Sequence, residues 1–361
     1  MPKTLLIILF TFIIASAACA GSVPAPLTTE LPTPQPATST QASPVPEPIP
    51  SDVQSATVEA TVVVEPSVFA PPGLRVVYLR EGNLWSWTEA SDNVMLTGTG
   101  DMSTARLSND GQLLAFIRGR EVWTIRMDGT AARLLVTQNE EGGALWFAPN
   151  GSLLAVSTSD HIDVIDLANA TTNTVAAYPA VPDGFYPEIK WSSDSAGFKT
   201  VIPARSEKGQ AEFLFVMTDG TKASLAKFSM LPPAESLPFI SPDGGYVIYA
   251  AKLSDDKESL YLMDSSGATR PYGKSAGNIH TYGWLPDSKH FVYAQENPNR
   301  SLLGDVMGSS PVETDVTSFE VMRWLDDEHF LAIEGDELYL GDLNGNKTFI
   351  AEDVTDFDFR K

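Results

Sequence analysis

The sequence predicts an all-β fold built from a repeated unit, and three observations support this. First, imperfect copies of one turn motif recur from about residue 65 onward, each preceded by a large apolar residue. Second, short apolar runs separated by tight turns lie between the copies. Third, no stretch after residue 73 has sustained helical periodicity. The apolar positions are spaced between 38 and 49 residues apart, and they are Phe69, Leu107, Phe147, Trp191, Ile240, Trp284 and Trp324. This period is typical of the four-stranded blades of a β-propeller.

The second unit shows its four strands most clearly. We expect them at residues 105–107, 113–117, 122–125 and 133–136. Asn109-Asp110-Gly111 joins the first pair and Asp128-Gly129-Thr130 joins the last pair. These are suitable turn residues, because Asn and Asp tolerate left-handed backbone conformations and Gly adopts positive φ at little cost.

Seven turn registers predict seven blades, with six as the alternative because the first and last blades are the least well marked. Two segments could supply the innermost strand of the first blade, residues 61–69 and residues 354–359. The C-terminal segment alternates cleanly and resembles residues 319–324, whereas the first segment contains Pro66, which cannot donate to a sheet ladder. We therefore expect the C-terminal strand to close the ring.

The turn motif itself carries a family resemblance. Ser241-Pro242-Asp243-Gly244 is an intact Ser-Pro-Asp-Gly turn, and Ala148-Pro149-Asn150-Gly151 and Ser108-Asn109-Asp110-Gly111 are near copies. From about residue 65 to the end, the chain resembles the TolB-like, or PD40, propeller repeats, which are relatives of WD40 repeats. The resemblance implies a propeller that works through protein contacts in a cell envelope. Propellers host many functions, so the fold alone does not identify the ligand.

The N-terminal region predicts export. Lys3 precedes an apolar run from Leu5 to Ile14 and small residues around Cys19, which is typical of a secretory signal. Residues 16–19 resemble a bacterial lipobox, which would make Cys19 a lipidation site; cleavage without lipidation, giving a secreted form, is the alternative. We assign residues 1–20 to the signal peptide, 21–60 to a disordered linker rich in Pro, Thr and Ser, and 61–361 to the propeller.

Composition limits the class of partner. The formal net charge is -22, which disfavours binding to nucleic acid or to anionic lipid headgroups. The single cysteine excludes a disulfide framework within the chain. We expect a monomer that contacts a membrane only through an N-terminal lipid.

The loops between second and third strands and those between blades share one face of a propeller, and in this sequence they are long and varied. Loops on a rigid scaffold often carry binding. The binding residues that we predict in these loops are Glu140, Glu141, Asp183, Tyr186, Arg205, Lys208, Asp255, Asp256, Asn297 and Arg300.

Other residue patterns have structural interpretations. The Asp residues of the turns, such as Asp110, Asp194, Asp243 and Asp287, are expected to cap their own turns. The tryptophans at 191, 284 and 324 are expected to pack between blades. Calcium bound near Asp255 and Asp256 is an alternative, but no EF-hand spacing surrounds them, and we expect no cofactor.

The four histidines belong to no metal-binding motif, and the chain lacks the G-x-S-x-G motif of α/β-hydrolases. We therefore expect a non-catalytic cell-envelope propeller that binds an envelope or extracellular protein through its loops. A carbohydrate or peptide binder, assisted by calcium or not, is the first alternative. A hydrolase that uses the central funnel is the second.

Overall fold

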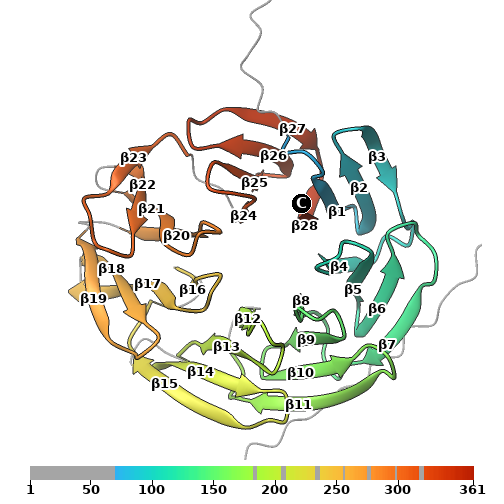
Figure 1. The fold of residues 1–361 in the computed structure, drawn as a ribbon, viewed down its shortest axis with the longest axis horizontal. Coiled ribbons are helices and arrows are strands. Elements are labelled where there is room, and N and C mark those ends of the chain that lie inside the picture. Colours follow the sequence, from blue (N-terminus) through green and yellow to red (C-terminus); the bar gives the residue numbers. More distant parts are fainter. Residues whose placement is uncertain are drawn as a thin grey trace, which may run out of the picture. The chain divides into compact units, whose positions relative to one another are not determined.

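The computed structural model describes residues 70–181, 185–204, 209–231, 236–254, 257–274, 278–296, 299–316 and 321–361. The strands of this part form seven four-stranded sheets. They are arranged as a ring, and the first strand of each sheet is nearest the centre (Figure 1). The all-β propeller with seven blades predicted from the sequence is therefore confirmed.

Within each blade, the strands follow one another from the centre of the ring outward. Blade 1 contains β28 (Val354–Arg360), β1 (Arg75–Arg80), β2 (Asn83–Thr88) and β3 (Ser91–Met95). Blade 2 contains β4 (Met102–Leu107), β5 (Leu113–Arg118), β6 (Glu121–Arg126) and β7 (Arg133–Thr137). Blade 3 contains β8 (Ala144–Phe147), β9 (Leu153–Ser157), β10 (His161–Asp166) and β11 (Thr171–Ala177). Blade 4 contains β12 (Ile189–Trp191), β13 (Gly197–Ile202), β14 (Ala211–Met217) and β15 (Lys222–Phe228).

The last three blades follow the same order. Blade 5 contains β16 (Phe239–Ile240), β17 (Tyr246–Ser254), β18 (Lys257–Asp264) and β19 (Thr269–Lys274). Blade 6 contains β20 (Ile279–Trp284), β21 (His290–Glu296), β22 (Asn299–Asp305) and β23 (Val312–Thr314). Blade 7 contains β24 (Val321–Trp324), β25 (His329–Glu334), β26 (Glu337–Asp342) and β27 (Lys347–Ala351). No helix within these described ranges is long and apolar enough to cross a membrane.

The C-terminal strand closes the ring, as the sequence predicts. β28 pairs with β1 in antiparallel register, with Arg75 opposite Arg360 and Tyr78 opposite Phe357. One large apolar residue precedes the first turn of each blade, and we call its place the register position. In blade 1 it is occupied by Phe359, which lies 35 residues after Trp324. Phe69, to which the sequence assigns this position, lies outside the described residues.

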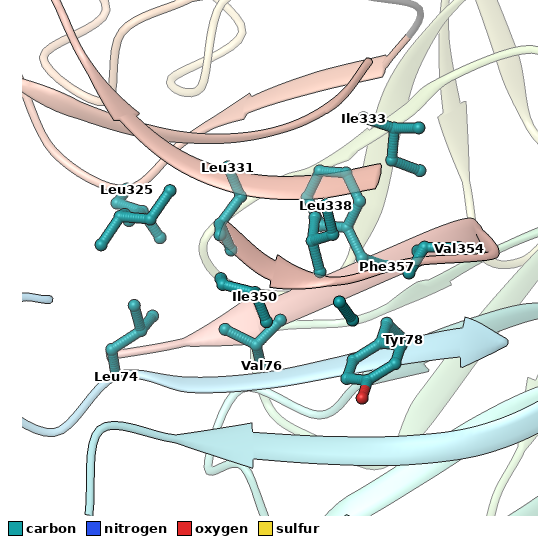
Figure 2. Close-up of a cluster of buried hydrophobic side chains, with 12 residues drawn as sticks. Leu74, Val76, Tyr78, Leu325, Leu331, Ile333, Leu338, Ile350, Val354 and Phe357 are labelled. Atoms are coloured by element: carbon teal, nitrogen blue, oxygen red, sulfur yellow. The ribbon is translucent and has the colours of Figure 1, made fainter. Parts of the chain in front are cut away.

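The hydrophobic core is divided among the gaps between blades. Each of the seven clusters of buried apolar side chains in the described part joins two neighbouring blades. Figure 2 shows the cluster at the closing gap, where Val76 and Tyr78 of β1 and Phe357 of β28 meet Leu331 and Leu338 of blade 7. Burying one such side chain contributes roughly 1.5–3 kcal/mol, so closure by β28 completes an apolar interface as well as a ladder.

Because all neighbouring strands of a blade are antiparallel, the connections sort onto two faces. The turns between first and second strands and between third and fourth strands lie on one face, which we call the turn face. The hairpins between second and third strands and the links between blades lie on the other, which we call the connection face.

Candidate binding channel

A channel of about 950 Å³ runs along the inner ends of the blades. Its wall includes residues of all seven innermost strands. Asn109, Pro149, Pro242 and Pro286 line it at the turn face, and Phe185, Tyr186 and Leu237 line it at the connection face. This volume falls in the range of small-molecule binding sites, which makes the channel the main candidate functional site.

The inner edges of the blades are hydrogen-bonded across the gaps between them. Trp191 Nε1 donates to the Trp146 carbonyl oxygen at 3.1 Å, and Trp284 Nε1 donates to the Phe239 carbonyl oxygen at 2.9 Å. Their rings also pack edge-on against Phe198 and Phe291 of their own blades. An open strand edge presents unpaired backbone groups, and these indoles cover part of it. The prediction that these tryptophans pack between blades is thus confirmed.

Trp324 packs in the same way but has a different polar environment. Its ring meets Phe330 edge-on, with centroids 5.1 Å apart. Its Nε1 is buried and finds no hydrogen-bond partner within the described residues. The third tryptophan of the register therefore contributes apolar packing to the gap between blades 6 and 7.

In each innermost strand, the residue immediately before the register position lines the channel. Together these seven residues form a ring around it. The side chains of this ring differ strongly in character, and they are Arg106, Trp146, Lys190, Phe239, Gly283, Arg323 and Asp358 in blades 2 to 7 and 1. Blades 3 and 5 contribute aromatic rings on either side of Lys190. Blades 7, 1 and 2 contribute three consecutive charged groups. The channel is therefore aromatic on one side and ionic on the other.

The ionic side is a cluster of arginines around two carboxylates of β28. Arg106 Nη1 lies 2.5 Å from Asp356 Oδ2, and Arg323 Nη2 lies 3.4 Å from Asp356 Oδ1. Asp358 lies 3.5 Å from Arg323 Nη1 and 3.4 Å from Arg360 Nη1. We call these five residues the arginine cluster. It links blades 7, 1 and 2 across the closing strand.

The two carboxylates also accept backbone hydrogen bonds from β4. Asp356 Oδ2 accepts from the Ala105 N–H at 3.1 Å, and Asp358 Oδ2 accepts from the Leu107 N–H at 2.8 Å. Glu188 has the same role at the gap between blades 4 and 5, accepting from the Ile240 N–H at 3.2 Å while it pairs with Lys190 Nζ at 2.8 Å. These acidic side chains satisfy backbone groups at exposed strand edges, a use that no local sequence pattern indicates.

The turn aspartates cap their own turns, as predicted. Asp110 Oδ1 accepts from the Ser108 hydroxyl at 2.6 Å and from the Gln112 N–H at 3.0 Å. Asp194 makes the equivalent bonds with the Ser192 hydroxyl and the Ala196 N–H. In both turns the serine hydroxyl, followed by the backbone N–H, holds the pKa of the carboxyl below its ordinary value. Asp243 and Asp287 accept N–H bonds from their own turns in the same manner.

Four of the predicted loop residues are described, and two of their loops meet. Tyr186 lines the channel, and its hydroxyl lies so close to Gly142 that a Cβ added there would be 2.4 Å away. Glu140 and Glu141, which precede Gly142, are exposed, and Glu140 Oε2 accepts from the Ser159 hydroxyl at 2.8 Å. Arg300 is exposed on β22, in blade 6.

The other predicted site residues lie outside the described part. They are Cys19, Asp183, Arg205, Lys208, Asp255, Asp256 and Asn297. Glu258, which follows the acidic pair, is described, and its Oε2 accepts from the Ile279 N–H at 2.8 Å. No group of three or more His, Cys, Asp or Glu side chains within the described ranges is arranged to hold a metal ion.

The histidines form pairs with nearby carboxylates. His290 Nδ1 lies 2.5 Å from Asp287, and His329 Nδ1 lies 2.9 Å from Asp326. His161 contacts Asp160, and His280, which lines the channel, lies 3.6 Å from Glu296. His161, His290 and His329 are the first residues of strands that follow a turn, and each contacts the carboxylate of that turn.

No family model matches the sequence, and no curated protein matches it. Among solved structures, the chain is similar to the tricorn protease, with a TM-score of 0.56 and 10% identity over 77% of this chain and 34% of that one. It therefore spans about a third of the length of the tricorn protease chain. It is also similar to TolB from Acinetobacter baumannii, with a TM-score of 0.45 and 12% identity over 79% of this chain and 66% of that one.

A third solved structure of this kind is the hydrazine synthase of Kuenenia stuttgartiensis, with a TM-score of 0.49 and 15% identity over 67% of this chain and 77% of that one. At these identities the likeness concerns the fold. The ring of seven blades and the likeness to the tricorn protease define the chain as a seven-bladed β-propeller. This fold commonly acts as a binding scaffold.

Proposed function

We propose that the chain is an exported, non-catalytic propeller that binds a partner protein across its connection face. The observation that carries the proposal is an apolar patch at the channel mouth on that face, formed by Phe185, Tyr186 and Leu237. Leu237 is 41% exposed, although large apolar side chains are usually buried. Tyrosine side chains near the centre of an interface are typical anchors of protein binding, and exposed apolar groups beside them add area that a partner can bury.

The patch is held rigidly by neighbouring blades. The Leu237 carbonyl oxygen accepts from the Thr281 hydroxyl of β20 at 2.7 Å. Tyr186 abuts Gly142 in the link between blades 2 and 3. A surface that is fixed before binding loses less conformational entropy when a partner is bound. This favours recognition of a folded protein surface.

The surroundings of the patch define the charge of the expected partner. Glu140, Glu141 and Glu296 are exposed on the loops and hairpin ends of the connection face, and the whole chain has a formal charge of -22. A complementary partner would present basic residues around an apolar centre, because complementary charge speeds encounter and suppresses wrong partners.

The carboxylates of the arginine cluster and of Glu188 support a non-catalytic role. Asp356 and Asp358 are engaged by arginines and by backbone N–H groups, and Glu188 is paired with Lys190. A general acid or base needs an available proton position beside the substrate. We likewise propose no cofactor, and we propose that the protein acts as a monomer in the cell envelope.

A cross-linking pull-down from native envelope extract tests this function. The full chain, a Leu237→Glu variant and a Met307→Glu variant are used as bait. Met307 is the matched control, because it is 81% exposed and lies in the turn that follows β22, on the turn face. We expect a protein to be recovered with the full chain and with Met307→Glu, and to be lost with Leu237→Glu. Equal recovery with all three baits would contradict the proposed face.

The proposed anchor has a separate test. In a bacterial host, metabolic labelling with an alkyne fatty acid should label the wild-type chain and leave Cys19→Ser unlabelled. Wild-type chain that is exported without label would show the secreted form instead.

A further inference from the structure

The arginine cluster has more positive than negative charge. It contains three guanidinium groups and two carboxylates, which gives a formal charge of +1. The side chains of Asp358 and Asp356 are 8% and 14% exposed, and that of Arg106 is 16% exposed. Arg323 and Arg360 are 27% and 30% exposed, and burying one excess positive charge in part favours a further anion at the cluster.

Arg106 and Arg323 both line the channel, and Arg106 has donors that its hydrogen bonds leave unused. Arg106 uses Nη1 for both of its hydrogen bonds, to Asp356 and to the Ala105 carbonyl oxygen. Within the described residues, its Nε and Nη2 donate no hydrogen bond. Arg106 and Arg323 are held close to one another because each lies against a different oxygen of Asp356. A fork of guanidinium donors is the geometry that binds carboxylates in bidentate fashion.

Blades 3 and 5 contribute two aromatic side chains to the same ring of residues, and both pack in part against the apolar clusters between blades. Trp146 and Phe239 are both partly exposed and lie in the same ring of residues as Arg106 and Arg323. Gly283 leaves room beside Phe239, since a Cβ added to it would lie 3.7 Å from that ring. Lys190 lies between the two aromatic residues in the ring and provides a polar donor. Such a mixture of aromatic faces and a few fixed polar groups is typical of small-ligand sites.

We propose that the channel binds a saccharide with a single carboxylate, of the uronic acid type. The carboxylate binds at the arginine cluster, and the sugar ring stacks on Trp146, which is next to Arg106 in the ring of channel residues. One excess positive charge matches one carboxylate, whereas the acidic surface of the chain opposes ligands with many negative charges. This site lines the same channel as the protein-binding patch but shares no residue with it, and either proposal can fail without the other.

The test compares ligands that differ in one group. The full chain is titrated with methyl β-glucuronide, with methyl β-glucoside, which has the same ring without the carboxylate, and with acetate, which has the carboxylate without the ring. Tryptophan fluorescence or the indole N–H signals report binding. We expect the glucuronide to bind at least tenfold more tightly than either of the other two ligands.

Two substitutions locate the site. Arg106→Gln should weaken glucuronide binding about tenfold or more, because it removes a charged hydrogen-bond donor. Arg133→Gln is the matched control, since Arg133 also donates to carbonyl oxygens of a neighbouring blade but lies on the outer strand β7. If Arg106→Gln does not fold, Trp146→Leu gives the second measurement and should also weaken binding. Four results would each overturn the proposal. They are equal binding of the glucuronide and the glucoside, equal binding of the glucuronide and acetate, no saturable binding of the glucuronide, and an equal loss of binding in Arg133→Gln.

Discussion

Asp358 accepts a hydrogen bond from the main-chain N–H of Leu107 at 2.8 Å, although 251 positions separate the two residues in the sequence. The bond connects the last strand of the chain to the innermost strand of blade 2. Asp356 makes the parallel bond to Ala105. Closure of the ring therefore depends on acidic side chains of β28 as well as on its ladder with β1.

Asp358→Ala should destabilise the protein strongly. The substitution leaves the Leu107 N–H without this acceptor and removes a carboxylate from Arg323 and Arg360. We expect the free energy of unfolding to fall by about 3 kcal/mol, the size of effect seen when one partner of a buried ion pair is removed. Chemical denaturation measures it, with Asp336→Ala as the control because Asp336 is exposed in the hairpin between β25 and β26. Equal losses in both variants would contradict this role of Asp358.

Ser288 should tolerate glycine better than alanine. It has a φ of 58°, in the left-handed region, and its hydroxyl accepts from the Asp243 N–H of blade 5 at 3.0 Å. Alanine loses the hydrogen bond and retains the strain, whereas glycine loses the bond but relieves the strain. We expect Ser288→Ala to cost about 1–2 kcal/mol and Ser288→Gly about 1 kcal/mol less. Thermal unfolding of the two variants measures the difference, and a glycine variant less stable than the alanine variant would refute it.

Stability should fall in acid partly because of Asp326. Burial raises the pKa of Asp326, but hydrogen bonds from Glu328, His329 and Lys361 outweigh it and lower the pKa to about 2. The folded pKa is below the unfolded value of about 3.9, so this group stabilises the protein above about pH 4 and loses its effect as pH falls toward 2.

Asp326→Asn is the variant that isolates this effect. The difference in melting temperature between wild type and Asp326→Asn should be constant above about pH 5 and should shrink toward pH 2. A difference that stays the same from pH 6 to pH 2 would show that the carboxylate makes no pH-dependent contribution.

The fold could be predicted from the sequence because the blades repeat one pattern of residues. The apolar register at Leu107, Trp191 and Trp284 falls at the end of β4, β12 and β20, because each blade places the same residue type at the same gap. Closure was predictable because Pro66 argued against the N-terminal segment and 354–359 copied the pattern of 319–324. The turn motif assigns Phe69 to the register position of blade 1 because a Pro-Pro-Gly turn follows it, whereas Phe359 occupies the position in the structure.

The residues of the channel wall were harder to predict from the sequence than the fold, for a physical reason. Arg106, Arg323 and Asp358 are polar residues within apolar strands, and their interactions join segments more than 30 residues apart. One sequence pattern does indicate the charged residues of the ring around the channel. Each of them stands immediately before the register position, and they are Arg106, Lys190, Arg323 and Asp358. Among the four predicted loop residues that the structure describes, Tyr186 lines the channel and the other three do not.

The most direct test of the proposed function is hydrogen exchange on the complex with the protein recovered by the pull-down. We predict that partner binding slows exchange in residues 185–189 and 236–239, at the channel mouth on the connection face, and leaves residues 108–113 and 305–309 on the turn face unchanged. Protection confined to the turn-face segments would contradict the proposal that the partner binds across the connection face.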